Sequence, residues 1–258
     1  MMSLVAIPSS LIRRLRATRR LVVLTGAGVS AESGIPTFRE AQTGLWARYD
    51  PQELATAAAF RRNPRLVWNW YQWRRSLVAS AAPNQGHIAL ARLQTLVPRL
   101  TLVTQNVDGL HQDAGSEHIV ELHGNLRRNK CFRNHHPVPP GEEIAAEDAE
   151  DPPRCPTCNS LLRPDVVWFG ESLPEDAVAT AFSAAQACEL FLAIGTSAIV
   201  HPAASLPFIA REAGAIIIEI NLNETALTPH ADYALHAASG EILPRLVNDG
   251  WPAAAAPD

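Results

Sequence analysis

Residues 21–39 read LVVLTGAGVSAESGIPTFR and combine an apolar strand with a glycine turn. The first four residues form the short, continuous apolar run that is typical of a buried parallel strand. Gly26 and Gly28 then allow a sharp turn and a close approach of a ligand to the backbone. The free N–H groups of such a turn suit a pyrophosphate, although an ordinary tight connection between strand and helix has the same pattern. The spacing departs from G-x-G-x-x-G, because the next glycine is Gly34 and Pro36 ends any helix there.

The composition is that of a globular protein without a basic surface for nucleic acid. The chain has 258 residues, a length that suffices for one large domain or two small ones, and 47% of them are hydrophobic. Its formal charge of −4 gives no basic surface for nucleic acid. The basic run 13–20 precedes an apolar segment too short for a signal peptide or a membrane span, so we expect a surface helix there. The four cysteines are too few and too uneven for a secreted disulfide framework and indicate a reducing cytoplasm.

Apolar strands alternate with segments of helical periodicity along most of the chain. This alternation predicts an α/β fold, a doubly wound parallel sheet of the Rossmann type, with two inserts. We expect strands at 21–24, 100–104, 119–122, 190–194 and 216–220, and helices at 51–82, 85–97, 174–188, 202–214 and 242–250. As one catalytic domain over 1–258, the chain divides into a core of 1–34, 83–128 and 161–250, a helical insert of 35–82, a small zinc-ribbon-like module of 129–160 and a disordered tail of 251–258.

Five polar or glycine positions directly follow predicted strands. They are Gly26, Gln105, His123, Gly195 and Asn221. Because ligands bind outside the carboxyl ends of the strands in such sheets, we expect these positions to surround one crevice. A histidine that titrates near neutrality at that edge suits a general base, although histidines alone are more often structural hydrogen-bonding groups.

Asn106 and Asp108 carry a carboxamide and a carboxylate at the same edge. These groups suit the binding of a small amide such as nicotinamide, and the alternative is that they cap their own turn. Tyr71 and Arg74 lie three residues apart and share a helix face. An arginine among aromatic residues suits a ligand carboxylate, whereas core packing is the more ordinary explanation.

The predicted module at 129–160 has the cysteines of a structural zinc site. Cys131, Cys155 and Cys158 supply three ligands, the last two in a C-x-x-C knuckle. The first pair is incomplete because Asn134 stands where a second cysteine is expected. His135 or His136 would complete the site, and we assign His135; the alternative is a loop held by packing without metal.

Together these features resemble the sirtuin family of NAD-dependent protein-lysine deacylases, over residues 21–246. Five motifs stand in the family's order: the glycine stretch 26–39, TQNVD at 104–108, HG at 123–124, FGE at 169–171 and GTS at 195–197. Ala55 and the YQWR of 71–74 are similar to the class III branch, the desuccinylases and demalonylases. In that branch a small residue widens the acyl pocket and Tyr-x-x-Arg binds the acyl carboxylate.

The resemblance implies a role for each matching residue. The catalytic residues would be His123, Asn106 and Asp108. The NAD-binding residues would be Gly26, Ala27, Gly28, Ser30, Glu32, Ile35, Pro36, Thr37, Phe38, Arg39, Gln105, Asn106, Asp108, Gly195, Thr196, Ser197, Asn221 and Ser239. The substrate would contact Ala55, Tyr71 and Arg74 through its acyl group, and Val167, Phe169, Gly170 and Glu171 through its peptide backbone, as an added strand.

The implied reaction transfers an acyl group from lysine to ADP-ribose. Nicotinamide would leave the NAD ribose as the acyl oxygen attacks, and His123 would be the general base for a ribose hydroxyl. We therefore expect a cytoplasmic, monomeric enzyme that removes succinyl, malonyl and also acetyl groups from lysines of proteins or peptides. Its products would be nicotinamide and O-acyl-ADP-ribose, and it would use NAD as co-substrate and a structural zinc, with no nucleic-acid or membrane partner. The alternatives are an NAD-dependent protein ADP-ribosyltransferase and a non-catalytic NAD or ADP-ribose-binding protein.

Overall fold

A computed structural model describes residues 5–36 and 49–252 of the chain. Its larger unit is a sheet of six parallel strands in the spatial order β3-β2-β1-β7-β8-β9. The strands are β1 (Arg20–Thr25), β2 (Arg99–Thr104), β3 (Val120–Glu121), β7 (Leu190–Ile194), β8 (Ile216–Asn221) and β9 (Tyr233–His236). The order reverses between β1 and β7, and sheets of this kind bind ligands beyond the carboxyl ends of the strands at that point. The predicted Rossmann-like fold is confirmed.

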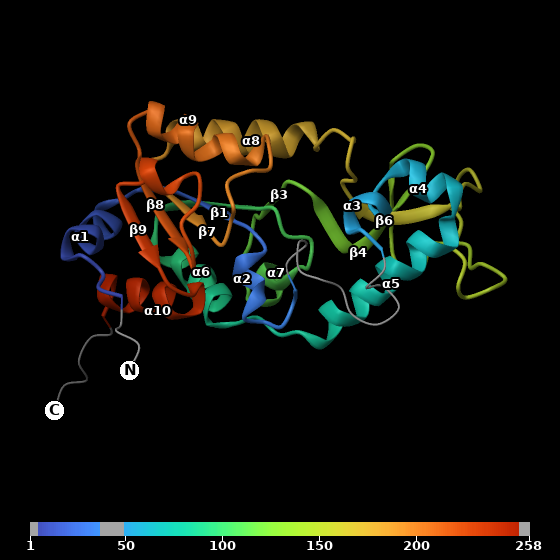
Figure 1. Cartoon of the computed structure of the whole chain (residues 1–258), viewed down its shortest axis with the longest axis horizontal. Coiled ribbons are helices and arrows are strands. Elements are labelled where there is room, and N and C mark those ends of the chain that lie inside the picture. Colours follow the sequence, from blue (N-terminus) through green and yellow to red (C-terminus); the bar gives the residue numbers. More distant parts are fainter. Residues whose placement is uncertain (1–4, 37–48, 253–258) are drawn as a thin grey trace.

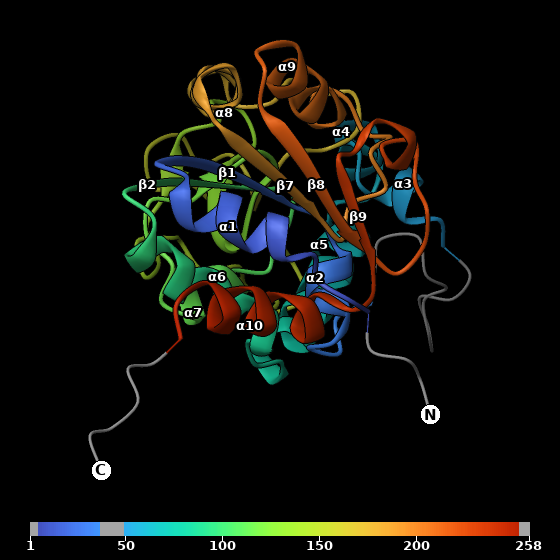
Figure 2. The same ribbon diagram turned by 90° about the vertical axis from the view of Figure 1, so that its left-hand side faces the viewer.

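Helices cover both faces of this sheet (Figure 2). One face is packed against α8 (Glu175–Ala187) and α9 (Leu206–Glu212), and the other against α1 (Ser9–Ala17), α6 (Gln85–Leu96) and α10 (Ser239–Gly250). Leu11 and Leu15 of α1 are buried, whereas its arginines are exposed, so the basic run is the predicted surface helix. Short helices complete the unit: α2 (Gly28–Ala31), α7 (Leu110–Asp113) and the 3₁₀ turns η2 (Ala203–Ser205) and η3 (Thr228–His230).

The smaller unit lies beside the carboxyl edge of the large sheet (Figure 1). It combines an antiparallel sheet in the order β5-β4-β6 with three helices. Its elements are α3 (Pro51–Leu54), α4 (Ala57–Arg62), α5 (Pro64–Ser80), β4 (Gly124–Cys131), β5 (Pro137–Val138) and β6 (Leu162–Val166). Phe60 and Trp70 from the helices share one core with Leu126, Val166 and Trp168. The two inserts, which the sequence analysis treated separately, therefore pack as one body.

Several boundaries differ from the prediction. The small sheet extends from Gly124 to Val166, beyond 129–160, because β4 reads GNLRRNKC and has no apolar run to mark it as a strand. The helical stretch 51–82 is three helices, since Thr56 and Asn63 each accept backbone N–H groups as caps and begin a new one. The short strand β9 was not predicted.

The C-terminal region also differs from the prediction. The last helix begins at Ser239 rather than at 242. Trp251 packs on the core of the large unit, so the predicted disordered tail is wrong for that residue, while residues 253–258 lie outside the described ranges. Within those ranges, no helix has the length and apolar character needed to cross a bilayer.

Candidate active site

The turns after β1 and β7 cross each other so closely that both need glycine. A Cβ added to Gly26 would lie 2.7 Å from the carbonyl oxygen of Gly195, and one added to Gly28 would lie 2.8 Å from the Cα of Gly195. Gly195 itself has a φ of +59°, and its Cβ would lie 2.5 Å from the nitrogen of Val29. These glycines are therefore required by backbone packing at the point where the strand order reverses, whatever ligand they also approach.

A buried hydrogen-bond network fixes Asn106 and Asp108 beside this turn. The Asn106 amide donates to the Gly26 carbonyl and to Ser30 Oγ, both at 3.1 Å. Ser30 in turn donates to Asp108 Oδ2 at 2.8 Å, and Asp108 Oδ1 accepts the N–H of Leu110 at 2.9 Å. The carboxamide nitrogen is thus engaged with the protein, which fixes the orientation of the side chain.

His123 is half-buried and has a defined tautomer. Its Nδ1 lies 3.0 Å from the carbonyl oxygen of Gln105, and because a carbonyl can only accept, Nδ1 carries the proton. Nε2 is then the unprotonated, basic nitrogen. Burial lowers the pKa of His123 below its ordinary value of 6.5, although the bond to Gln105 opposes this shift. Burial therefore favours the neutral ring, the form that can accept a proton.

The remaining strand ends are joined through Thr196. Gln105 Nε2 donates to Thr196 Oγ1 at 2.9 Å, and Asn221 Nδ2 donates to the Thr196 carbonyl at 3.0 Å. The network of Asn106 reaches Gly26, and His123 is bonded to Gln105. The structure thus brings together all five positions that were predicted from the strand ends.

Other predicted cofactor residues lie around the same turn. Glu32 accepts hydrogen bonds from Ser239 Oγ at 3.1 Å and from the N–H of Gly240 at 2.9 Å, so its carboxylate stabilises the start of α10. Ala27 and Ser197 are half-buried beside the glycine turns, and Ile35 and Pro36 follow α2. Thr37, Phe38 and Arg39 lie outside the described residues.

The predicted acyl-binding residues lie in the smaller unit. Tyr71 is buried on α5, and its hydroxyl accepts the indole N–H of Trp168 at 2.9 Å. Burial raises the pKa of Tyr71 to about 12. The Arg74 guanidinium lies 5.2 Å from the ring centroid of Trp70. Burial lowers the pKa of Arg74, and the charges of Tyr71 and Asp108 oppose that shift, so Arg74 is within electrostatic reach of the network around Asn106.

The predicted peptide-binding segment runs between the two units. The N–H of Val167 donates to the His123 carbonyl, and that of Phe169 to the carbonyl of buried Ala55, both at 2.9 Å. Glu171 forms an ion pair with Arg163, a side chain with no exposed surface. Gly170, at a φ of +85°, forms the turn that returns Glu171 to Arg163. The Glu171 carboxylate therefore stabilises this segment from inside.

Two residues that support this segment, Trp168 within it and Arg163 in β6, were missed by the sequence analysis. Trp168 is 1% exposed, and the Arg163 guanidinium carbon lies 3.2 Å from the centroid of its ring. Trp168 directly precedes the FGE motif, which could have indicated its position. Arg163 lies in a strand that has no recognisable pattern, so nothing in the sequence marked it.

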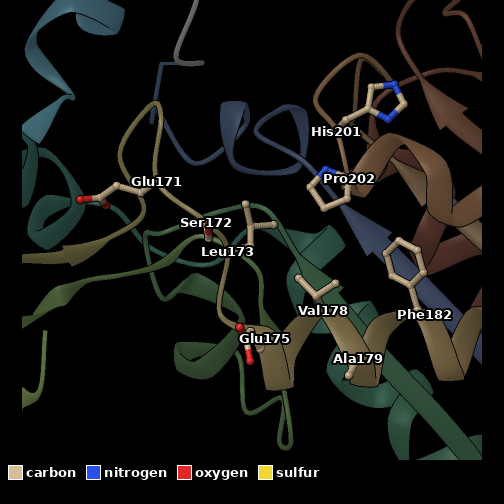
Figure 3. A pocket seen from close by; sticks show the side chains of 9 residues that line it. All are labelled: Glu171, Ser172, Leu173, Glu175, Val178, Ala179, Phe182, His201 and Pro202. Atoms are coloured by element: carbon tan, nitrogen blue, oxygen red, sulfur yellow. The ribbon is translucent and has the colours of Figure 1, made fainter.

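A hollow of about 610 Å³ opens beyond Glu171, between the peptide segment, α8 and the loop before η2. Figure 3 shows Leu173, Val178, Phe182 and Pro202 around this space, while the Glu171 side chain points away from them. The lining is mainly apolar. The hollow thus adjoins the expected peptide-binding segment at Glu171.

The cysteines of the smaller unit meet as predicted, with one correction. The ligand atoms of Cys131, Cys155 and His136 lie within 4.8 Å of one another, and Cys158 Sγ lies 3.5 Å from Cys131 Sγ. His136 Nε2 is 3.3 Å from Cys155 Sγ, whereas His135 is exposed with a φ of +58°. His136 therefore replaces His135, because the tight turn after Cys131 directs the later histidine to the sulfurs.

This cluster has the chemistry of a structural zinc site. Three thiols and one imidazole are a common tetrahedral ligand set for zinc. The N–H of Asn134 points at Cys131 Sγ at 3.4 Å, so the residue that breaks the cysteine pair still contributes a backbone donor. Burial opposes ionisation of Cys155, but nearby backbone N–H groups and His136 outweigh it and lower the pKa of Cys155 to about 6. The residues present fit a structural zinc ion.

Comparison with known proteins identifies the family. Residues 26–202 match the Sir2 family, and the chain belongs to that family. The NAD-dependent protein deacylase of Pyrococcus furiosus is 49% identical over 232 residues, which cover 88% of this chain and 92% of that protein.

Solved structures agree with this assignment. A Sir2 homologue in complex with NAD is 45% identical, with a TM-score of 0.88 over 97% of this chain and 96% of that one. A Sir2 protein bound to an acetylated peptide is 32% identical, with a TM-score of 0.83 over 95% of this chain and 99% of that one.

Proposed function

We propose that this chain is an NAD-dependent protein-lysine deacylase that removes succinyl and malonyl groups and, more slowly, acetyl groups. The proposal rests above all on the geometry of His123, a neutral imidazole whose Nδ1 proton is bonded to Gln105 and whose Nε2 is free of that proton. The similarity to proteins named NAD-dependent protein deacylase, and to Sir2 structures with NAD and with acetylated peptide, supports it.

The network of Asn106, Ser30 and Asp108 would bind the nicotinamide end of NAD. Its amide and carboxylate groups are held by internal hydrogen bonds, so little ordering is needed when the ligand binds. The turns at Gly26 and Gly195 would take the pyrophosphate, and Thr196 and Asn221 the adenosine half. When bound, NAD would supply the electrophilic ribose carbon, and the residues of this chain would orient it.

His123 would accept a proton at Nε2 from a ribose hydroxyl while that hydroxyl attacks the acyl carbon. After that transfer, the Nδ1–H of His123 still donates to the Gln105 carbonyl, which stabilises the imidazolium that forms. A positioned base of this kind accelerates its step by about 10² to 10⁴. The lysine nitrogen then leaves as the free amine, one water completes the transfer, and the acyl group remains on the ribose as O-acyl-ADP-ribose.

Tyr71 and Arg74 would select acidic acyl groups. Burial lowers the pKa of Arg74, and nearby negative charge opposes that shift. A succinyl or malonyl group carries a carboxylate that would interact with this guanidinium, whereas an acetyl group carries none. Ala55, which is buried against the peptide segment, leaves room for the longer acyl chain.

Zinc would have a structural role. Cys131, Cys155, Cys158 and His136 would hold the end of the small sheet, away from the reacting atoms. All four cysteines are free thiols, and we propose the cytoplasm as the compartment.

The test is a reaction of purified protein with NAD and a succinyl-lysine peptide, followed by mass spectrometry. We expect free lysine peptide, nicotinamide and O-succinyl-ADP-ribose. Nicotinamide with ADP-ribose attached to an acceptor protein would instead support the transferase. If no acylated peptide causes nicotinamide release, the result would support a non-catalytic NAD or ADP-ribose-binding protein.

A further inference from the structure

The hydroxyl of Tyr71 has a fixed hydrogen-bond direction. An indole N–H can only donate, so the tyrosine oxygen must be the acceptor of the bond from Trp168 Nε1. Among the described residues, Trp168 is the sole hydrogen-bond partner of this hydroxyl. The hydroxyl proton is therefore directed away from Trp168. Since burial raises the pKa of Tyr71 to about 12, the hydroxyl remains a donor at neutral pH.

Trp168 is in turn held by a buried ion pair. The guanidinium of Arg163 stacks on its ring at 3.2 Å and donates to Glu171 Oε2 at 2.9 Å. Glu171 Oε2 also accepts the backbone N–H of Trp168 at 2.9 Å, and Arg163 Nη2 donates to the Val166 carbonyl at 2.7 Å. These bonds close the loop from Val166 to Glu171 around one cation, so the position of the indole is fixed.

The aromatic neighbours support the same geometry. The rings of Tyr71 and Trp168 are stacked with centroids 6.3 Å apart, and Phe60 packs on Trp168 at 5.4 Å. The charges of Arg74 and Arg163 both act on Tyr71, from α5 and from β6. The tyrosine is thus within electrostatic reach of both the arginine that would bind the acyl carboxylate and the arginine that fixes the tryptophan.

We infer that Trp168, held by Arg163 and Glu171, is a positioning residue for acyl selection: it directs the Tyr71 hydroxyl as a donor to the acyl carboxylate. This inference rests on the proposed deacylase function and extends it. The selectivity of the site then depends on a chain of contacts, from Arg163 through Trp168 to Tyr71, and not on Tyr71 and Arg74 alone. An acetyl group has no carboxylate and gains nothing from this chain.

The test is Trp168→Phe, which keeps an aromatic ring but removes the indole N–H. We expect KM for a succinyl peptide to rise about fivefold with little change in kcat, the effect of one hydrogen bond, and deacetylation to stay the same. Trp68→Phe is the matched control, because Trp68 is buried on the same helix as Tyr71 but packs under Arg75. In a Tyr71→Phe background, Trp168→Phe should have no further effect on the ratio of the two activities.

Two outcomes would overturn the inference while wild-type desuccinylation stands. One is an equal loss of both activities in Trp168→Phe, and the other is no loss of either activity. If the wild type cleaves no acylated peptide, the proposed function itself fails. If Trp168→Phe does not fold, the test is hydrogen exchange of the Trp168 indole N–H. We expect faster exchange in Tyr71→Phe than in wild type. Equal exchange would contradict the hydrogen bond between Trp168 and Tyr71.

Discussion

The two units of the molecule prepare their side chains for the proposed reaction in opposite ways. At the edge of the large sheet, His123 is kept neutral and Asn106 is held by neutral partners. In the smaller unit, Arg74 and Arg163 are cations that lie among aromatic rings. A step that moves a proton needs a neutral base. The choice between acyl groups needs a buried charge, which favours an acyl group with a carboxylate over one without. Under the proposed function, the large unit carries out the chemistry and the smaller unit selects the acyl group.

The strongest test of the catalytic unit is His123→Ala. We expect deacylation of every acyl peptide to fall by about 10² to 10⁴, because the proton at the ribose hydroxyl loses its acceptor. Binding of NAD, measured by calorimetry, should remain. His230→Ala, at an exposed histidine beside Phe208, is the control and should keep full activity. Retained turnover in His123→Ala would remove this residue from its role.

In the selecting unit, Arg74→Met should separate the two activities. Removing one partner of a buried charged pair costs about 2–5 kcal/mol, so kcat/KM for the succinyl peptide should fall by about 30-fold or more. Deacetylation should change little. The exposed Arg62 on α4 provides the control Arg62→Met. The division between the units would be wrong if both activities fell together.

Loss of the metal should affect stability more than chemistry. Cys158→Ser should lower the zinc content, measured by mass spectrometry of the native protein, and lower Tm because structural zinc contributes to folding. Cys188→Ser is the control for zinc content, since Cys188 lies in the core under α8, apart from the cluster. Equal zinc content in wild type and Cys158→Ser would exclude Cys158 as a ligand.

The smallest expected effect is on the pH profile. In the proposed mechanism the active form of His123 is neutral, and burial lowers the pKa of this residue. Protonation on lowering the pH should therefore inactivate the enzyme only below the ordinary value of 6.5. The profile of kcat/KM against pH measures this in the free enzyme. A midpoint of the acid limb above 6.5 would show that the nearby groups stabilise the charged ring instead.

The sequence predicted the large unit better than the small one, for a physical reason. Gly26, Gln105 and Asn221 each follow an apolar strand, and parallel strands necessarily bring their carboxyl ends to one edge. Tyr71 and Arg74 were associated with the site only through the resemblance to sirtuins. The meeting of α5 with β6 depends on tertiary packing that no local pattern records.

The same reason explains the errors. His136 rather than His135 reaches the cysteines because the backbone turns with a positive φ at His135. The sequence shows two adjacent histidines but not this turn. Arg163 reads as an ordinary charged residue in LLRPDV, yet it is buried and neutralised by Glu171 from eight residues further along.

NAD-dependent removal of acidic acyl groups can be measured directly with one peptide that carries acetyl-, malonyl-, succinyl- or glutaryl-lysine. The wild-type enzyme is incubated with each form, with and without NAD, and each product is followed by mass spectrometry. We expect NAD-dependent removal that is faster for succinyl and malonyl than for acetyl, and no removal without NAD. Deacylation that ignores the carboxylate, or that proceeds without NAD, would contradict the account.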